Sequence, residues 1–112
     1  TTPASVELLV EVKEIYQDWI LFKVNWGEIE VDGVTYYVIG GWWRGSYNKI
    51  THVGQYEGWA QDDSGNNVYF VIRTSDLGQT QEGCFMRMKG AFRDPEGNYW
   101  LLNLLTYRFK IN

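Results

Sequence analysis

Apolar and polar residues alternate along most of this chain with a period of two residues. Between Val6 and Val12, for example, Glu7 and Glu11 lie between apolar positions. This is the spacing of a half-buried strand rather than of a helix. The same pattern predicts further strands over residues 19–31, 34–43, 54–61, 67–74, 84–93 and 98–111. No stretch keeps a helical period over ten residues, so the chain is predicted to be all-β and mostly antiparallel.

Turn signals separate these strands. Asp32-Gly33 is a strong two-residue hairpin signal, because glycine adopts the positive φ of a tight turn at no cost. Pro and Gly mark another turn at residues 94–97. Residues 44–53 are expected to form the longest irregular stretch, and the connection at 75–83 has room for one helical turn.

A length of 112 residues fits one domain with one core, so residues 1–112 are predicted to form a single domain. Six or seven strands in an open sheet would leave exposed edges. Closing or partly closing the sheet removes those edges. The expected architecture is therefore a small antiparallel barrel, closed or partly closed.

The last predicted hairpin resembles the closing hairpin of OB-fold domains. It consists of the strand from Gly83 to Arg93, a polar turn that ends at Gly97, and the apolar run from Tyr99 to Leu102. The resemblance implies an OB-like barrel that binds single-stranded nucleic acid. However, the chain has more predicted strands than the five of that family and no clear helix between the third and fourth. An up-and-down barrel of the lipocalin or avidin-like type is therefore the alternative fold.

Aromatic residues are unusually abundant, with six Trp, eight Tyr and five Phe. The interior of one small barrel can hold about half of such large rings, so the others must lie on a surface. Exposed flat rings are stacking platforms, which predicts a non-enzymatic binding module. The competing interpretation is that the surplus rings form a protein interface, because interfaces are enriched in Tyr, Trp and Arg.

Cationic and aromatic residues share one predicted strand face, since Arg73, Arg87 and Lys89 fall on the same side as Tyr69 and Phe85. Single-stranded nucleic acid requires such a surface, because bases stack on rings while cations follow the phosphates. An ordinary solvated strand face would have the same pattern. The residues predicted to contact nucleic acid are Trp43, Arg44, Tyr47, Trp59, Tyr69, Arg73, Phe85, Arg87 and Lys89.

Strand parity also predicts where several other aromatic residues lie. Trp42 and Trp43 are adjacent and follow Gly40-Gly41, so they cannot both enter one core. Trp19 and Trp26 are expected on opposite faces of one strand, with one of them in the core. Trp100, in an apolar run, is expected to be buried.

Composition excludes several other functions. The formal net charge of −4 argues against a duplex-binding protein that depends on phosphate neutralisation. Cys84 is the only cysteine, so no internal disulfide can form and a reducing, cytoplasmic location is favoured. With His52 as the only histidine and no catalytic, phosphate-cradling or dinucleotide motif, no metal, cofactor or catalytic site is predicted. No apolar run approaches the length of a membrane span.

Single-stranded nucleic acid is the predicted partner. A carbohydrate stacked on exposed Trp and Tyr rings is one alternative, and a small apolar ligand inside the barrel is another. A homo-oligomer or a protein partner that covers the rings is a further alternative, which is compatible with each of the others.

Overall fold

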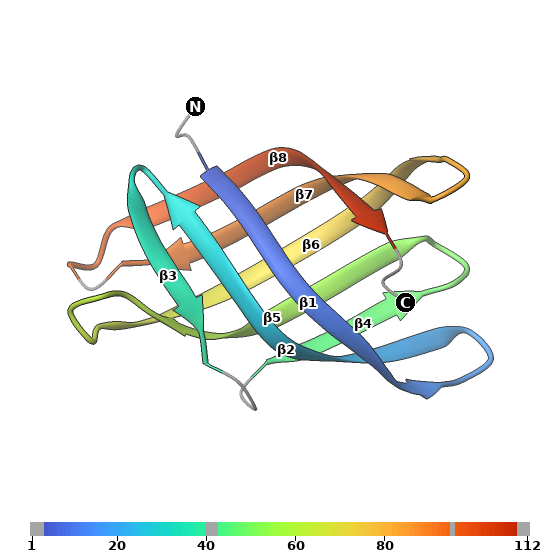
Figure 1. The fold of residues 1–112 in the computed structure, drawn as a ribbon, viewed down its shortest axis with the longest axis horizontal. Helices are drawn as coiled ribbons and strands as arrows, with labels where there is room; N and C mark the ends of the chain where they lie inside the picture. Colours follow the sequence, from blue (N-terminus) through green and yellow to red (C-terminus); the bar gives the residue numbers. More distant parts are fainter. Residues whose placement is uncertain (1–3, 40–42, 95, 110–112) are drawn as a thin grey trace.

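The computed structural model describes residues 4–39, 43–94 and 96–109, which form one antiparallel sheet of eight strands (Figure 1). In chain order these are β1 (Ala4–Ile15), β2 (Trp19–Val31), β3 (Val34–Val38), β4 (Arg44–Asn48), β5 (Val53–Gln61), β6 (Asn67–Gln79), β7 (Gly83–Arg93) and β8 (Tyr99–Phe109). The all-β prediction is confirmed, because strands account for about three quarters of the described residues and none of these residues is in a helix.

Apart from β4, the strands are ordered in the sheet as they are along the chain: β1-β2-β3-β5-β6-β7-β8. β4 occupies the same position as β3, since each pairs with both β2 and β5. Pairing of β2, β3, β5 and β4 closes a circuit, and β1 contacts β8. The prediction of a small antiparallel barrel is therefore confirmed.

The barrel has two layers that cross at a steep angle. Figure 1 shows β1, β2 and β3 in front of β5, β6, β7 and β8. The strand order follows the chain, as in the up-and-down arrangement that was the alternative to the OB-like one. The relationship of this chain to OB-fold domains stays a prediction.

The core is filled by every second residue of each strand. Phe70 and Ile72 are fully buried, and the ring of Phe70 lies 4.5 Å from that of Phe92 and 5.5 Å from that of Tyr36, centroid to centroid. Cys84 is buried as the sequence predicts. These rings occupy the space between the two layers, so the barrel is a packed body.

The interior does not hold all the rings, as the sequence predicts. Among the described residues, eight aromatic side chains are exposed: Tyr16, Trp19, Trp26, Tyr37, Trp59, Tyr69, Phe85 and Tyr99. Trp100 is half-buried and packs against the core.

The prediction that Trp19 or Trp26 lies in the core is wrong, because both are exposed. The register of β1 and β2 shifts after the Leu9–Trp26 pair, and Asn25 has no partner in it. This β-bulge turns Trp26 to the outer face, on the same side as Trp19.

Two predicted loops belong to strands. Residues 44–48 form β4, because this segment pairs with β2 on one side and β5 on the other. The expected helical turn within 75–83 is also absent: β6 runs to Gln79 and pairs with β7 across a bulge at Leu77. The Asp32-Gly33 hairpin is confirmed, with positive φ at both residues.

The five-residue pattern Asp-x-x-Gly-Asn occurs twice and closes two hairpins, β5–β6 and β7–β8. In the second hairpin, Asp94 Oδ1 accepts hydrogen bonds from the amides of Glu96 and Asn98. Asp94 Oδ2 accepts from Trp100 Nε1 at 2.9 Å and from Asn98 Nδ2. Gly97 supplies the positive φ of the turn. The same hydrogen bonds from the amides and from the Asn side chain surround Asp62 in the first hairpin.

Hydrogen bonds from Trp100 and then from Asn98 and Glu96 stabilise the ionised form of Asp94 and lower the pKa of its carboxyl group. Because this pKa is lower in the folded than in the unfolded state, the contribution to stability is present above about pH 4 and is lost as the pH falls through the folded pKa.

We expect Asp94→Ala to lower the urea midpoint of unfolding at pH 7, because four donors lose their acceptor. The difference from the wild type should shrink below about pH 4, where the wild-type carboxyl group becomes protonated. Asp63→Ala, at an exposed position of the other hairpin turn, is the control and should leave the midpoint unchanged. An equal midpoint for Asp94→Ala and wild type at pH 7 would contradict this role.

Candidate functional site

The outward side of β6, β7 and β8 carries four cations, Arg73, Arg87, Lys89 and Arg93. All four are exposed, and within residues 67–75, 85–93 and 99–107 no carboxylate points outward beside them. We call this surface, together with the exposed rings on it and at its border on β5, the basic face. Its positive charge is local, since the chain as a whole has a formal net charge of −4.

Strand register brings three of these cations together. Arg73 lies directly opposite Lys89, and Lys89 lies opposite Asn103. Arg87 donates a hydrogen bond to the same Asn103 side chain, with 3.2 Å between Nη1 and Oδ1. Like charges directly opposite each other destabilise a sheet. An anion bound between Arg73 and Lys89 would relieve that repulsion.

Two pairs of aromatic rings flank the cations. Trp59 lies opposite Tyr69 in the register, and their rings meet edge to face with 5.1 Å between centroids. At the other end, Phe85 lies opposite Tyr107 with 4.8 Å between centroids. Trp59, Tyr69 and Phe85 are 41%, 38% and 51% exposed, so each keeps part of a ring open to a ligand.

A further ring on the basic face already interacts with a cation. Arg93 lies opposite Tyr99, and its guanidinium carbon is 5.4 Å from the centroid of the Tyr99 ring. The Tyr99 side chain is 75% exposed. Leu101 lies beside Tyr99 on β8, and Leu105 lies on the same outward side further along the strand. Both leucines are similarly exposed, so the face also offers apolar contact area.

A hollow of about 620 Å³ lies around β4, next to the basic face. Lys13, Lys23 and Arg44 line it together with Gln55 and Glu57. The register connects the two areas, because Gln55 lies opposite both Ser46 of β4 and Arg73 of β6. The neutral residues Gln55 and Ser46 therefore connect the basic face to the hollow, where Glu57 lies directly opposite Arg44.

Seven of the nine predicted contact residues lie exposed on this continuous outer surface: Arg44, Trp59, Tyr69, Arg73, Phe85, Arg87 and Lys89. Trp43 and Tyr47 do not, because both side chains point into the barrel and are buried. The expectation that these two rings stack on a ligand at the outer surface is therefore corrected. Gly40, Gly41 and Trp42, which were considered with them, lie outside the described residues.

Trp43 is 5% exposed, and its Nε1 donates a hydrogen bond to the carbonyl oxygen of Trp59 at 2.6 Å. It follows β3 and precedes Arg44, whose side chain is outward. Because successive strand residues face opposite sides, Trp43 must be inward. Its role is to anchor the start of β4 to β5.

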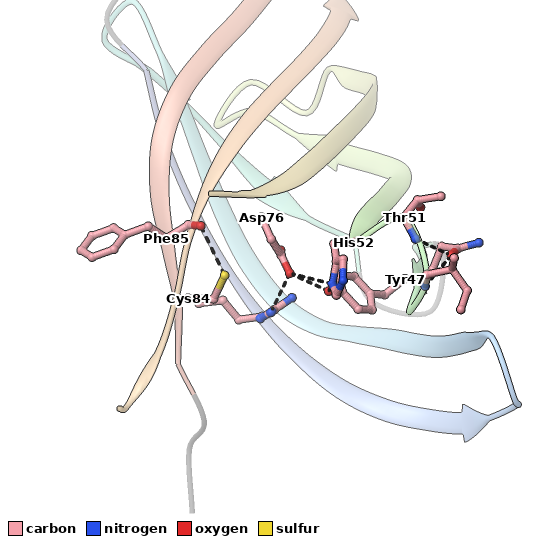
Figure 2. Close-up of polar contacts among 9 residues, drawn as sticks. Tyr47, Thr51, His52, Asp76, Cys84 and Phe85 are labelled. Carbon is pink, nitrogen blue, oxygen red and sulfur yellow. Dashed lines mark hydrogen bonds and ion pairs between the residues drawn. The ribbon is translucent and has the colours of Figure 1, made fainter. Parts of the chain in front are cut away.

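Tyr47 belongs to a polar cluster at one end of the barrel, which Figure 2 shows. Tyr47 Oη donates to Asp76 Oδ2 at 2.5 Å, and Arg108 Nη2 lies 3.4 Å from the same oxygen. His52 Nδ1 is 3.0 Å from Tyr47 Oη. Burial, and then the hydrogen bond to Asp76, raises the pKa of Tyr47 to about 12. The cluster pairs one oxygen of the Asp76 carboxylate, whose side chain is only 11% exposed, while the other oxygen, Oδ1, is buried without a hydrogen-bond partner among the described residues. The contacts to Oδ2 have a structural role.

Several residues of this surface were not among the predicted contact residues. Arg93 and Tyr99 could have been found, because a hairpin closed by residues 94–98 places them opposite each other. Lys13 and Lys23 could not have been assigned, since they come near Arg44 only through β4, which was expected to be a loop.

In the described part of the chain, no group of three or more His, Cys, Asp or Glu residues could hold a metal ion. Over the same residues, no helix has the length and apolar character needed to cross a bilayer.

We expect Tyr47→Phe to lower the free energy of unfolding by about 1–3 kcal/mol, because the buried Asp76 carboxylate loses its nearest donor. Since the pKa of Tyr47 is higher in the folded state, this contribution is complete below about pH 10 and is lost as the pH rises to about 12. The gap between wild type and variant in denaturant unfolding should narrow over that interval. Tyr37→Phe, at an exposed ring, is the control, and a Tyr47→Phe variant as stable as Tyr37→Phe at pH 7 would contradict the assignment.

Comparison with protein-family models, with curated proteins and with solved structures gave no match to this chain.

Proposed function

We propose that this protein is a non-enzymatic module that binds single-stranded nucleic acid on its basic face. The observation that carries the proposal is the cluster of Arg73, Arg87 and Lys89 between the exposed rings of Trp59 and Tyr69 and the exposed ring of Phe85. No outward carboxylate lies among these cations on the described parts of β6–β8. The cations can neutralise phosphates of the strand, and the rings can stack on its unpaired bases. A duplex offers phosphates but keeps its bases stacked, so it would leave the rings unused.

The mechanism divides into two kinds of contact. Arg73, Lys89 and Arg87 neutralise phosphates of the strand, which also relieves the repulsion between the first two. Trp59 with Tyr69, and Phe85 at the far end, each accept a base on the open part of a ring. Stacking of this kind tolerates any base, because every base has a π-face.

The dimensions of the face fit a short stretch of strand. From Phe85 to Arg93 along β7 the face extends about 26 Å, at about 3.3 Å per residue. Arg44, Lys23 and Lys13 are further cations beside the hollow. A strand longer than the face would reach them past the neutral residues Gln55 and Ser46.

A carbohydrate is the second candidate ligand, and one observation favours it. Glu57 and Gln55 lie next to the exposed ring of Trp59 on β5, and a carboxylate with an amide is a suitable partner for sugar hydroxyls. Glu57 already accepts a hydrogen bond from Tyr69 Oη at 3.0 Å. The salt dependence of the affinity distinguishes the two ligands. Binding of nucleic acid weakens as salt rises because it releases counterions, whereas binding of a neutral sugar does not release them.

The interior gives a small apolar ligand less support, because Phe70, Phe92 and Tyr36 occupy the centre of the barrel. We place the protein in the cytoplasm as part of the same proposal. Its single cysteine is a buried free thiol, which is the form expected in a reducing compartment.

We expect Trp59→Ala to weaken binding of a fluorescein-labelled mixed-sequence oligonucleotide by about 5- to 150-fold in fluorescence anisotropy, because stacking contributes about 1–3 kcal/mol per base. Trp19→Ala is the matched control, since Trp19 is 45% exposed but lies at the start of β2, outside the basic face. Equal affinities of the two variants would count against the basic face as the binding site.

The salt dependence of the same titration tests the phosphate contacts. Arg73→Ala combined with Lys89→Ala should reduce the slope of log affinity against log salt by about 1.4, because each phosphate contact on a single strand contributes about 0.7. Lys49→Ala, in the turn between β4 and β5, should leave the slope unchanged. A wild-type affinity independent of salt, together with binding to a soluble polysaccharide, would replace nucleic acid by carbohydrate.

A further inference from the structure

The outward side of residues 5–9 of β1 and 26–30 of β2 has the opposite charge to the basic face, whereas Lys13 and Lys23 lie at the other end of these strands. Glu7, Glu28 and Glu30 point outward there, and Glu7 lies directly opposite Glu28 in the register. Over residues 5–9, 26–30 and 34–37, no described outward residue is a cation. We call the outward surface of these residues the acidic face.

The acidic face also carries exposed apolar side chains. Leu9 and Trp26 lie opposite each other and are 42% and 44% exposed. Tyr37 lies opposite Glu28 on the neighbouring strand and is 42% exposed. Exposed rings between like charges are typical of a surface that another molecule covers. A partner of opposite charge would bury the apolar area and neutralise the repulsion between the carboxylates.

The two faces lie on opposite sides of the barrel. Figure 1 looks down the shortest axis and shows β1 and β2 in the front layer, with β6 and β7 behind them. The molecule measures 41 × 29 × 24 Å. Because the view in Figure 1 is along the shortest dimension, the front and back layers, and with them the two faces, lie on the two broad sides.

We propose that copies of this chain associate head to tail, with the acidic face of one copy on the basic face of the next. The chain itself supplies the complementary surface: the Glu7–Glu28 pair meets the Arg73–Lys89 pair, and Leu9, Trp26 and Tyr37 meet Tyr99, Leu101 and Leu105. Such a contact is heterologous, so it builds a ring or an open chain of copies.

This association does not depend on the proposed nucleic-acid binding, but it uses the same basic face. A bound strand and a second copy therefore compete for Arg73 and Lys89. Nucleic acid is expected to dissociate the assembly, and the free protein would hold its basic face covered until a polyanion displaces the neighbouring copy.

Sedimentation velocity of the full chain tests the association. At about 100 μM protein, the wild type should form dimers and larger species in about 50 mM salt, and its association constant should fall about tenfold or more in about 500 mM salt. The double variants Glu7→Lys/Glu28→Lys and Arg73→Glu/Lys89→Glu should each sediment as monomers in the low-salt buffer. An equimolar mixture of these two variants should again associate, because each then presents charges opposite to those of the other.

The control is Asp63→Lys/Glu82→Lys, which changes the net charge as much as the first variant but at turns outside both faces. It should associate like the wild type. A monomeric wild type in low salt, or a Glu7→Lys/Glu28→Lys variant that associates like this control, would overturn the proposal. If the monomeric wild type instead binds an oligolysine peptide, the acidic face serves a foreign cationic partner and the second copy is excluded.

Adding a mixed-sequence oligonucleotide separates this proposal from the previous one. Dissociation of the wild-type assembly by the strand supports the shared basic face. If the assembly forms and obeys the charge variants but is unaffected by oligonucleotide, head-to-tail association stands and the proposed nucleic-acid binding fails.

Discussion

The limited interior of the barrel is the constraint on which the rest of this structure depends. Each strand residue faces either the core or the solvent, and the core between the two layers is filled by rings such as Phe70, Phe92 and Tyr36. Eight further aromatic side chains are therefore exposed. Several of them lie among charges that are separated between the two broad sides, with cations on the outward face of β6–β8 and carboxylates at residues 7, 28 and 30 of β1 and β2. Both proposed interfaces depend on this separation of charge.

Much of the fold could be predicted from period-two alternation and from turn residues. Strand parity placed Phe85, Arg87 and Lys89 on one outward face, and the structure agrees because β7 contains no bulge between them. The hairpin at Asp32-Gly33 followed from local chemistry alone. Where local sequence determines the conformation, prediction from sequence succeeded.

The errors arose where tertiary pairing overrides local pattern. The bulge at Asn25 moved Trp26 to the surface. Gly27, two residues later, is the one sequence signal of a bulge or bend in this strand, but it does not give the position of the bulge. Residues 44–48 have a loop-like composition with Gly45 and Ser46, yet two neighbouring strands hold them extended as β4. Tyr47 was interpreted as a surface ring because its partner Asp76 is distant in sequence, and only the closed barrel brings the two together.

The separation of charge between the two broad sides has a consequence for how the molecule approaches a partner. A body with carboxylates on one side and guanidinium groups on the other has an electric dipole across its shortest dimension, in addition to its net charge of −4. In the field of a polyanion this dipole experiences a torque that turns Arg73 and Lys89 toward the phosphates before any contact forms. Encounters would thus be oriented while the two molecules are still about a Debye length apart, roughly 8–10 Å at moderate ionic strength. A protein that is acidic overall can in this way meet a negatively charged strand productively.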